Sequence, residues 1–427
     1  GLGRRVEQFT AFDETGVEVA LTQPAPGQFL AAQSAKRIRY EINLRPVSRA
    51  ADFSMISWLD KERGVLMTSD LLPVLSGAAG ANQLNFRIHF QLPKAWAVHS
   101  GELKSSPDAY ALVERGRAVF AVGANLRVSQ TNASGLTLNF VTSGDWAFTD
   151  ADAVQLAQQV LKAHHETFGS FPSQTATFIL FPFPLAVSPS QWSAETRGTT
   201  VTLIMGKLPS RVAALAQLST PVTHEFFHLW IPNALALEGN YDWFYEGFTT
   251  YEAAHAAVNL GLLTFPEFLN SISRAYDSSR SETSLSLIEA SSRRFTSGLT
   301  SVYAKSQIVA FLYDLRLRSA TRNKRSLSDV YRKLVDSSRS DNTRTKRVDG
   351  NEVVAGVLSE EIKTDEFVRA FIQRPVSINL ESELAPFGLK VDSTGVRTQI
   401  SVNEKLSKQQ RDLLRELGYN AATHAAR

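Results

Sequence analysis

Two imidazoles and a carboxylate lie close together in the segment 223–228, Thr-His-Glu-Phe-Phe-His. His224 and His228 are four residues apart, so on a helix of 3.6 residues per turn they share a face and can bind one metal ion. Glu225 lies about 100° further round the helix, where it can take a proton from a water molecule activated by that ion. This pattern is typical of zinc peptidases and predicts metal-assisted hydrolysis.

A third ligand is available further along the chain. The aromatic segment 243–251, Trp-Phe-Tyr-Glu-Gly-Phe-Thr-Thr-Tyr, carries Glu246 near its centre. A structural zinc ion usually has four protein ligands, whereas a catalytic one has three and keeps a position for water. His224, His228 and Glu246 would therefore hold one catalytic Zn²⁺ ion. A histidine pair alone is more often packing, and a lone glutamate is more often at the surface, but the combination favours the metal site.

Together these motifs resemble those of the glycyl aminopeptidase family of zinc metallopeptidases. They are more distantly similar to aminopeptidase N and leukotriene A4 hydrolase, within the gluzincin group. The resemblance extends along most of the chain: residues 70–73 (Asp-Leu-Leu-Pro) and 92–93 (Leu-Pro) resemble the family's N-terminal β domain, and residues 326–331 resemble its helical part. It implies a thermolysin-like catalytic domain with a helical domain behind it.

Tyr303 begins the sequence Tyr-Ala-Lys-Ser, which resembles the Tyr-x-Lys-Gly element of these enzymes, with Ser306 in place of the glycine. The resemblance implies that Tyr303 donates a hydrogen bond to the oxyanion of the tetrahedral intermediate. A phenol suits this role because it is a neutral donor at pH 7. Without the resemblance, a tyrosine at the start of an apolar helix would more often belong to the core.

Glu195 is the candidate for binding the substrate. Family members carry a Gly-Gly-Leu-Glu-His-like segment whose glutamate helps to hold the free amino group of the peptide. The matching segment is 192–199, Trp-Ser-Ala-Glu-Thr-Arg-Gly-Thr, in which the glutamate is present but the two glycines and the histidine are missing. Glu195 would then pair with an α-ammonium group, as an aminopeptidase requires. Alternatively, Glu195 and Arg197 form an ordinary solvated pair.

Composition excludes several other classes of protein. The 427 residues are 43% hydrophobic and 20% charged, and the net charge is +3. These values are ordinary for a soluble globular protein of two or three domains. The absence of cysteine excludes disulfides, thiolate zinc ligands and a cysteine nucleophile. No basic stretch is interleaved with aromatic residues, so no nucleic-acid partner is expected. No apolar run reaches the ~20 residues of a membrane span.

The expected architecture is a multidomain α+β protein. Short alternating runs predict an antiparallel β domain over residues 1–148. A thermolysin-like zinc catalytic domain is expected over 149–260, and a mainly helical domain with a small mixed C-terminal segment over 261–427. Within the catalytic domain, strand 199–205 is expected to be an open sheet edge to which a peptide can add. Helix 211–218 is expected to end before a second, zinc-binding helix at 221–230, with Pro221 in its first turn.

Four other titratable residues are given ordinary places. His164 and His165 end a helix over 150–168, where the helix dipole favours positive charge. Glu252 and His255 lie beyond the proposed ligand Glu246 and are expected mainly at the surface, although one of them could support the metal site.

These patterns predict a zinc-dependent peptidase, best described as an aminopeptidase that removes N-terminal residues with the help of a metal-activated water. An endopeptidase, or a catalytically weak peptide-binding module on the same fold, is the alternative. The expected partner is a peptide, and the oligomeric state is left open. No signal peptide is visible at Gly1. The resemblance favours a periplasmic or secreted bacterial protein over a cytoplasmic one.

Overall fold

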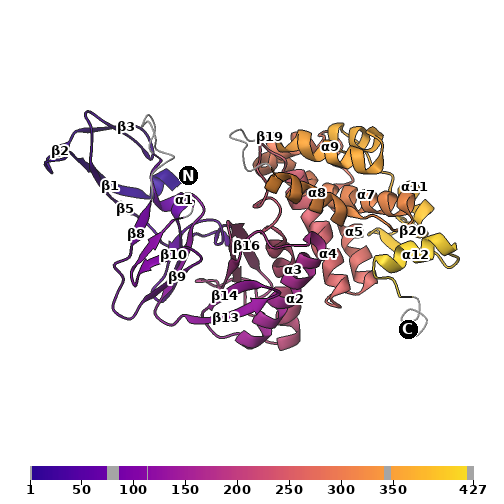
Figure 1. The fold of residues 1–427 in the computed structure, drawn as a ribbon, viewed down its shortest axis with the longest axis horizontal. Coiled ribbons are helices and arrows are strands. Elements are labelled where there is room, and N and C mark those ends of the chain that lie inside the picture. Colours follow the sequence, from indigo (N-terminus) through magenta and orange to yellow (C-terminus); the bar gives the residue numbers. More distant parts are fainter. Residues whose placement is uncertain (1, 75–85, 113, 341–347, 421–427) are drawn as a thin grey trace. The chain divides into compact units, whose positions relative to one another are not determined.

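The computed structural model describes residues 2–74, 86–112, 114–340 and 348–420. Two compact units are present. One comprises residues 1–130, 138–146 and 175–208, and the other comprises residues 131–137, 147–174 and 209–427. Figure 1 shows that strands dominate the N-terminal part of the chain and helices the C-terminal part. The α+β class and the antiparallel N-terminal sheets are thereby confirmed, whereas domain boundaries at residues 148 and 260 stay predictions.

Strands build most of the first unit. Their bounds are β1 Val6–Phe12, β2 Glu18–Val19, β3 Leu21–Ala25, β4 Gln28–Ala31, β5 Arg37–Ile42, β6 Trp58–Leu59, β7 Arg63–Met67, β8 Arg87–His89, β9 Ala97–Ser100, β10 Leu103–Ser106, β11 Ala109–Ala111, β12 Val119–Gly123, β13 Arg127–Ala133, β14 Leu136–Thr142, β15 Thr175–Pro182, β16 Trp192–Arg197 and β17 Thr200–Met205. Short helical turns lie at Leu2–Arg5 (η1), Ala50–Asp52 (η2) and Thr68–Leu71 (α1).

These strands form sheets in the orders β2-β1-β5, β10-β11-β8, β6-β7-β12-β9 and β13-β14-β15-β17-β16, with a separate hairpin β3-β4. The core of the unit lies where strands of the last two sheets contribute large apolar side chains, including Trp58, Ile179, Phe181 and Ile204. All six residues of β17 are buried, because the continuous run Thr-Val-Thr-Leu-Ile-Met suits a strand covered on both faces.

The expectation that strand 199–205 is an open edge was wrong. β17 pairs in parallel with β15 on one side and antiparallel with β16 on the other. The register Arg197↔Thr200 leaves only two residues for the connection between β16 and β17, and Gly198 supplies the positive φ of +55° that this tight turn requires. β16, which carries Glu195, is therefore the edge strand of the five-stranded sheet.

Helices dominate the second unit. Their bounds are α2 Asp150–Phe168, α3 Arg211–Phe227, α4 Thr249–Asn259, α5 Phe265–Ser279, α6 Leu287–Ser292, α7 Ser306–Thr321, α8 Leu327–Ser340, α9 Gly350–Ile362, α10 Glu366–Val368, α11 Leu380–Leu384 and α12 Lys408–Glu416. Four π-helical turns (η4 Trp243–Phe248, η5 Arg294–Gly298, η6 Ser301–Lys305 and η7 Arg369–Gln373) and a 3-10 turn (η8 Ala385–Phe387) lie between them. The small pairs β18 Leu237–Glu238 with β19 Val348–Asp349, and β20 Leu389–Asp392 with β21 Gln399–Val402, complete the unit.

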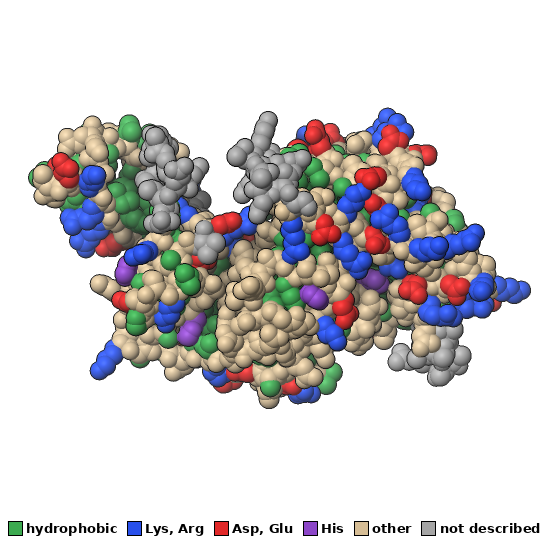
Figure 2. All heavy atoms as spheres, in the orientation of Figure 1, with side chains coloured by type: hydrophobic (Ala, Val, Ile, Leu, Met, Phe, Trp, Pro, Cys, Tyr) green, Lys and Arg blue, Asp and Glu red, His purple; other side chains and the backbone are tan. Residues whose placement is uncertain are grey.

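Local sequence explains where several of these helices begin. Helix α2 starts as expected at Asp150, and Thr149 caps it: the Thr149 hydroxyl accepts from the Asp152 amide while the Asp152 carboxylate accepts from the Thr149 amide. Equivalent capping boxes start α5 and α6. On the face shown in Figure 2, acidic and basic side chains are intermixed over the helices of this unit. Within the described ranges, none of the helices combines the length and apolar character needed to span a bilayer.

Candidate metal centre

One continuous helix, α3, presents the first part of the candidate site. The expected break before Pro221 was wrong: α3 runs from Arg211 to Phe227 with Pro221 inside it. A proline costs a helix one hydrogen bond to the carbonyl four residues earlier, but the buried side chains of α3, including Leu218, Val222 and Phe226, hold the helix together through packing. His228 caps the helix with φ −65° and ψ −14°, which is still close to helical geometry.

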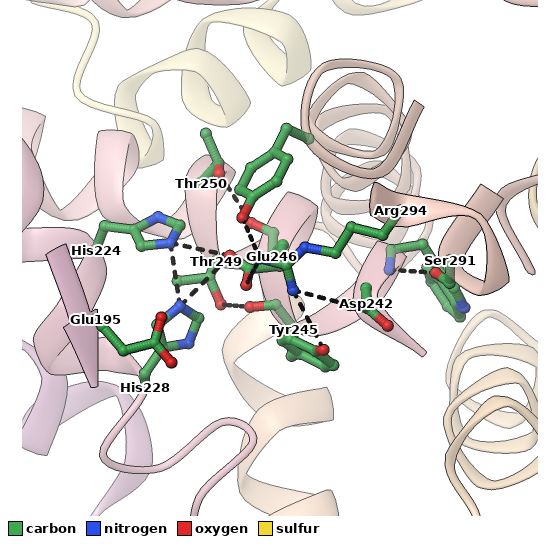
Figure 3. Close-up of polar contacts among 12 residues, drawn as sticks. Glu195, His224, His228, Asp242, Tyr245, Glu246, Thr249, Thr250, Ser291 and Arg294 are labelled. Atoms are coloured by element: carbon green, nitrogen blue, oxygen red, sulfur yellow. Dashed lines mark hydrogen bonds and ion pairs between the residues drawn. The ribbon is translucent and has the colours of Figure 1, made fainter. Parts of the chain in front are cut away.

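The two histidines converge. His224 Nε2 lies 3.1 Å from His228 Nε2, and Figure 3 shows the two rings directed toward the same point. His228 Nδ1 is 2.7 Å from the carbonyl oxygen of Ile231. Because a carbonyl oxygen only accepts, Nδ1 must carry the proton, and Nε2 of the neutral ring keeps its lone pair for a metal.

Glu246 completes a triangle of ligand atoms. Its Oε2 lies 3.3 Å from His224 Nε2 and 3.6 Å from His228 Nε2. A tetrahedral zinc ion with bonds of about 2.0–2.1 Å separates its ligand atoms by about 3.3–3.4 Å, and the three observed distances bracket that value. Two imidazole nitrogens and a carboxylate oxygen are also the donor set that zinc prefers. The residues therefore fit the ion.

Charge in this cluster is arranged to attract a cation. Burial alone would raise the pKa of the Glu246 carboxyl, but its hydrogen bonds to His224 and His228 outweigh burial and hold the pKa well below its usual value. Burial alone would likewise lower the pKa of His228, yet the neighbouring Glu246 raises it to about 9. The carboxylate thus favours positive charge at the point where the three ligand atoms meet, and a bound metal ion supplies that charge.

Glu225 and Tyr303 lie beside the ligands. Glu225 is buried, with 6% of its surface exposed, and its carboxylate is close enough to both histidines for the three side chains to form one cluster within 4.8 Å. Tyr303 lies on η6 and makes a side-chain hydrogen bond with Glu246. Burial raises the pKa of the Tyr303 phenol well above its usual value, so the hydroxyl keeps its proton and can donate it to a hydrogen bond.

Sequence analysis did not identify three residues that surround Glu246. Arg294 contacts Glu246, Asp242 and Tyr303, and it also approaches Tyr245. Tyr245 and Asp242 lie one and four residues before Glu246 in the sequence and could have been suspected from that proximity. Arg294 is 48 residues further along the chain, in the polar stretch Ser-Ser-Arg-Arg-Phe-Thr-Ser, where nothing distinguishes it from its neighbour Arg293.

His164, expected at a helix end, and Glu252 and His255, expected mainly at the surface, are all buried. His164 is fully buried, and its Nε2 donates to the carbonyl oxygen of Thr223, 2.8 Å away. Burial lowers its pKa to about 4, so its ring is neutral and the expected interaction of a charged imidazole with the helix dipole does not apply. Glu252 and His255 are only 3% and 6% exposed and lie 3.6 Å apart. They are buried because α4 packs against α3, α5 and α7.

Glu195 lies on edge strand β16 in the first unit, opposite Thr202 of β17. Its Oε1 is 3.9 Å from Arg197 Nε. Arg197 also donates to Ser69 Oγ and to the carbonyl oxygen of Met55. The segment is thus a strand rather than a loop, and the ion pair between Glu195 and Arg197 is partly exposed.

A pocket of about 670 Å³ adjoins the candidate metal centre within the second unit. Helices α3, α4, α5 and α7 and the turn η6 supply its walls, and His224 and Tyr303 lie on its lining. Most of the remaining lining side chains are alanine, serine or threonine. Small side chains leave space, so the pocket can take a bulky group next to the ligand cluster.

The chain is similar to known peptidases in its N-terminal sequence and in its fold. Residues 1–122 match the family model of the Peptidase M61 N-terminal domain. An aminopeptidase N family protein from Idiomarina loihiensis has a similar structure, with a TM-score of 0.77 and 19% identity over 96% of this chain and 74% of the other. An M1 zinc metallopeptidase from Deinococcus radiodurans, crystallised as a mutant with a Tyr-Ser-Ala substrate, gives a TM-score of 0.55 and 12% identity over 88% of each chain. The fold is that of the M1 zinc metallopeptidases.

The resemblance to the zinc metallopeptidases is thereby confirmed: the N-terminal residues match a peptidase family model, and the chain shares its fold with M1 zinc metallopeptidases. A comparison with curated proteins gave no match.

Proposed function

We propose that this protein is a zinc-dependent peptidase, and specifically an aminopeptidase that removes N-terminal residues from peptides. The observation that carries the proposal is the triangle of His224, His228 and Glu246, which has the dimensions of a zinc ligand set and has Glu225 beside it. The M1 peptidase-like fold and the match of the N-terminal residues to a peptidase family support the same reaction class.

The reaction divides among a few groups. His224, His228 and Glu246 would hold the ion, which when bound polarises the scissile carbonyl and lowers the pKa of water to about 7. Glu225 removes the proton of the attacking water and delivers it to the leaving amine nitrogen. Tyr303 donates a hydrogen bond to the carbonyl oxygen as negative charge develops there. The pocket beside His224 and Tyr303 receives a substrate side chain.

Aminopeptidase specificity rests on Glu195. An extended peptide can add to an edge strand through main-chain hydrogen bonds, and β16 is the edge strand of its sheet. The Glu195 carboxylate then pairs with the α-ammonium group of the peptide, in exchange for its long contact with Arg197. The thermolysin-like character of the catalytic domain and a periplasmic or secreted location belong to the same proposal and rest on the family resemblance.

A second candidate function follows from the divergence of segment 192–199, which lacks the glycines and the histidine usual around the substrate-binding glutamate. That divergence favours an endopeptidase or a catalytically weak peptide-binding module. The presence of both Glu225 and Tyr303 argues for catalysis, because binding a peptide requires neither a general base nor an oxyanion donor.

A metal analysis coupled to a substrate panel tests the proposal. The zinc-loaded protein is incubated with peptides that have free amino termini, with the same peptides N-acetylated, and with internally quenched peptides. We expect one zinc ion per chain and cleavage of the free peptides at the first bond. Cleavage of the acetylated peptides alone would establish an endopeptidase. Binding of the peptides without cleavage would favour the binding module, and absence of bound zinc would overturn the metal centre.

A further inference from the structure

Arg294 is a largely enclosed cation, contacted by two carboxylates and two phenols. Only 13% of its side chain is exposed. Nη1 lies 2.8 Å from Asp242 Oδ1 and 3.4 Å from the Tyr245 hydroxyl, while Nη2 lies 2.8 Å from Glu246 Oε1 and 2.5 Å from the Tyr303 hydroxyl. A guanidinium group presents its donors in a rigid plane, so four acceptors held by one such group have fixed positions relative to one another.

The two carboxylate oxygens of Glu246 have different contacts. Oε1 accepts from Arg294, whereas Oε2 lies near the two histidine nitrogens. Figure 3 shows Glu246 between the histidine pair on one side and Arg294 on the other. The carboxylate therefore cannot rotate without breaking a charge-assisted hydrogen bond in a buried site. Arg294 in turn is anchored by Asp242, which is also buried.

Arg294 also prepares the hydroxyl of Tyr303. A guanidinium group has no acceptor, so the 2.5 Å contact requires the phenol oxygen to accept. The hydroxyl hydrogen is then directed elsewhere, and it currently bonds Glu246. A hydroxyl that accepts from a cation is polarised and becomes a stronger donor, which is the property needed opposite a developing oxyanion.

We propose that Arg294 is a positioning residue that couples the metal ligand Glu246 to the oxyanion donor Tyr303. This inference rests on the proposed zinc peptidase function. It predicts two separable effects of removing the guanidinium group. Zinc binding weakens, because Oε2 of Glu246 is no longer held toward the histidines. Turnover at saturating zinc slows, because the Tyr303 hydroxyl is no longer oriented toward the substrate oxyanion.

The test compares Arg294→Ala with Arg293→Ala in the full chain. Arg293 is the adjacent arginine, and it is exposed and not in contact with the proposed zinc ligands. Arg293→Ala removes the same charge as Arg294→Ala and is therefore the matched control. Zinc affinity is measured by competition with a chelator, which requires no turnover. We expect Arg294→Ala to bind zinc about 10–100-fold more weakly, and Arg293→Ala to bind it like the wild type. Unchanged zinc affinity in Arg294→Ala would overturn the proposal that Arg294 positions Glu246 for zinc binding.

A double-mutant cycle tests the link to Tyr303. The kcat and KM of zinc-saturated Arg294→Ala, Tyr303→Phe and the double variant are measured on a peptide that the wild type cleaves. We expect kcat to fall in both single variants with little change in KM, and the double variant to be no slower than the slower single one. Independent effects that multiply in the double variant would refute the coupling.

A conservative variant, Arg294→Lys, separates the loss of charge from the loss of guanidinium geometry. Arg294→Lys retains a positive charge but has a single ammonium group that cannot bridge Glu246 and Tyr303 with the same geometry. It is expected to fold and to recover part of the zinc affinity but little of the kcat, and it replaces the alanine variant if that variant does not fold.

If zinc-loaded wild type cleaves no peptide, the proposed function fails, while the zinc affinities still decide whether Arg294 positions Glu246.

Discussion

His228 illustrates how a single side chain is prepared for a metal before any ion arrives. Its ring is buried, its Nδ1 proton is committed to the Ile231 carbonyl, and its Nε2 faces His224 and Glu246. The tautomer is thus fixed by a backbone carbonyl just beyond the end of helix α3. Glu225, only three residues earlier, is placed differently, because the helix turns it out of the line joining the two histidines.

Because His228 is a proposed zinc ligand and Glu225 is the proposed base, substitutions of the two residues are expected to have different effects. His228→Ala removes one of three ligands, so the protein is expected to lose its zinc. Glu225→Gln keeps the ligand set and removes only the base, so we expect normal zinc content with kcat lowered at least about 100-fold. Elemental analysis and peptide hydrolysis measure the two quantities, with the exposed Glu238→Gln as a control. Near-normal turnover in Glu225→Gln would show that another group takes the proton.

At the scale of elements, three π-helical turns bring the polar residues together. Glu246 lies on η4, Arg294 on η5 and Tyr303 on η6, each next to a regular helix. A π turn adds a residue to the helical repeat, which rotates one side chain relative to those of the following helix, and such turns are frequent at functional sites. Close approach of η4 to η6 and to the start of α7 requires Gly247, because a Cβ there would lie 2.1 Å from Ser306 Cβ and 2.6 Å from the Val302 carbonyl oxygen.

Gly247→Ala is therefore expected to separate η4 from η6. Overpacking of this kind costs about 1–3 kcal/mol of unfolding free energy, and the displacement of Glu246 should also reduce zinc affinity. Thermal unfolding and chelator competition measure the two effects. The matched control is Gly356→Ala on α9, where a Cβ meets nothing within 4 Å. Adding Ser306→Gly removes the closest clash and should recover part of the stability. A fully stable, tight-binding Gly247→Ala protein would contradict the packing argument.

At the scale of the whole chain, His164 joins helix α2 to the backbone next to the metal ligands. Its Nε2 donates to the Thr223 carbonyl oxygen, its Nδ1 has no hydrogen-bond partner among the described residues, and its ring packs edge-on against Phe227 and Trp230. A second proton on this ring would have to be buried without an acceptor. This explains why burial lowers the pKa of His164 from 6.5 to about 4.

Stability should consequently fall in acid. Above pH 6.5 the ring is neutral in both the folded and the unfolded chain, so His164 contributes no pH dependence there. Between pH 6.5 and about 4 only the unfolded chain takes up the proton, and the unfolding free energy drops by up to about 3 kcal/mol. Urea unfolding across this range should show a smaller decrease for His164→Gln, which cannot titrate. Equal pH dependence in both proteins would place the titrating group elsewhere.

Sequence periodicity predicted the larger elements well. The bounds of α2 and the core strands near 175–182 and 200–205 follow from local spacing and side-chain type. Two errors came from interactions between elements. Pro221 was expected to start a helix, but packing keeps α3 continuous. Strand 199–205 was expected to be an edge, but the turn at Gly198 adds β16 beside it.

Residue types and spacing determined by themselves that His224 and His228 can share an ion, because a helix fixes their separation. They also marked Glu246 and Tyr303 through the resemblance. Only the tertiary structure decided that Glu246 Oε2 lies within 3.6 Å of both histidines, that Glu252 and His255 are buried, and that Arg294 contacts Glu246 and Tyr303. The physical reason is that helical periodicity relates residues a few positions apart, whereas the contacts of Glu246 with His224 and Arg294, which are 22 and 48 positions away, depend on how separate helices and π turns pack.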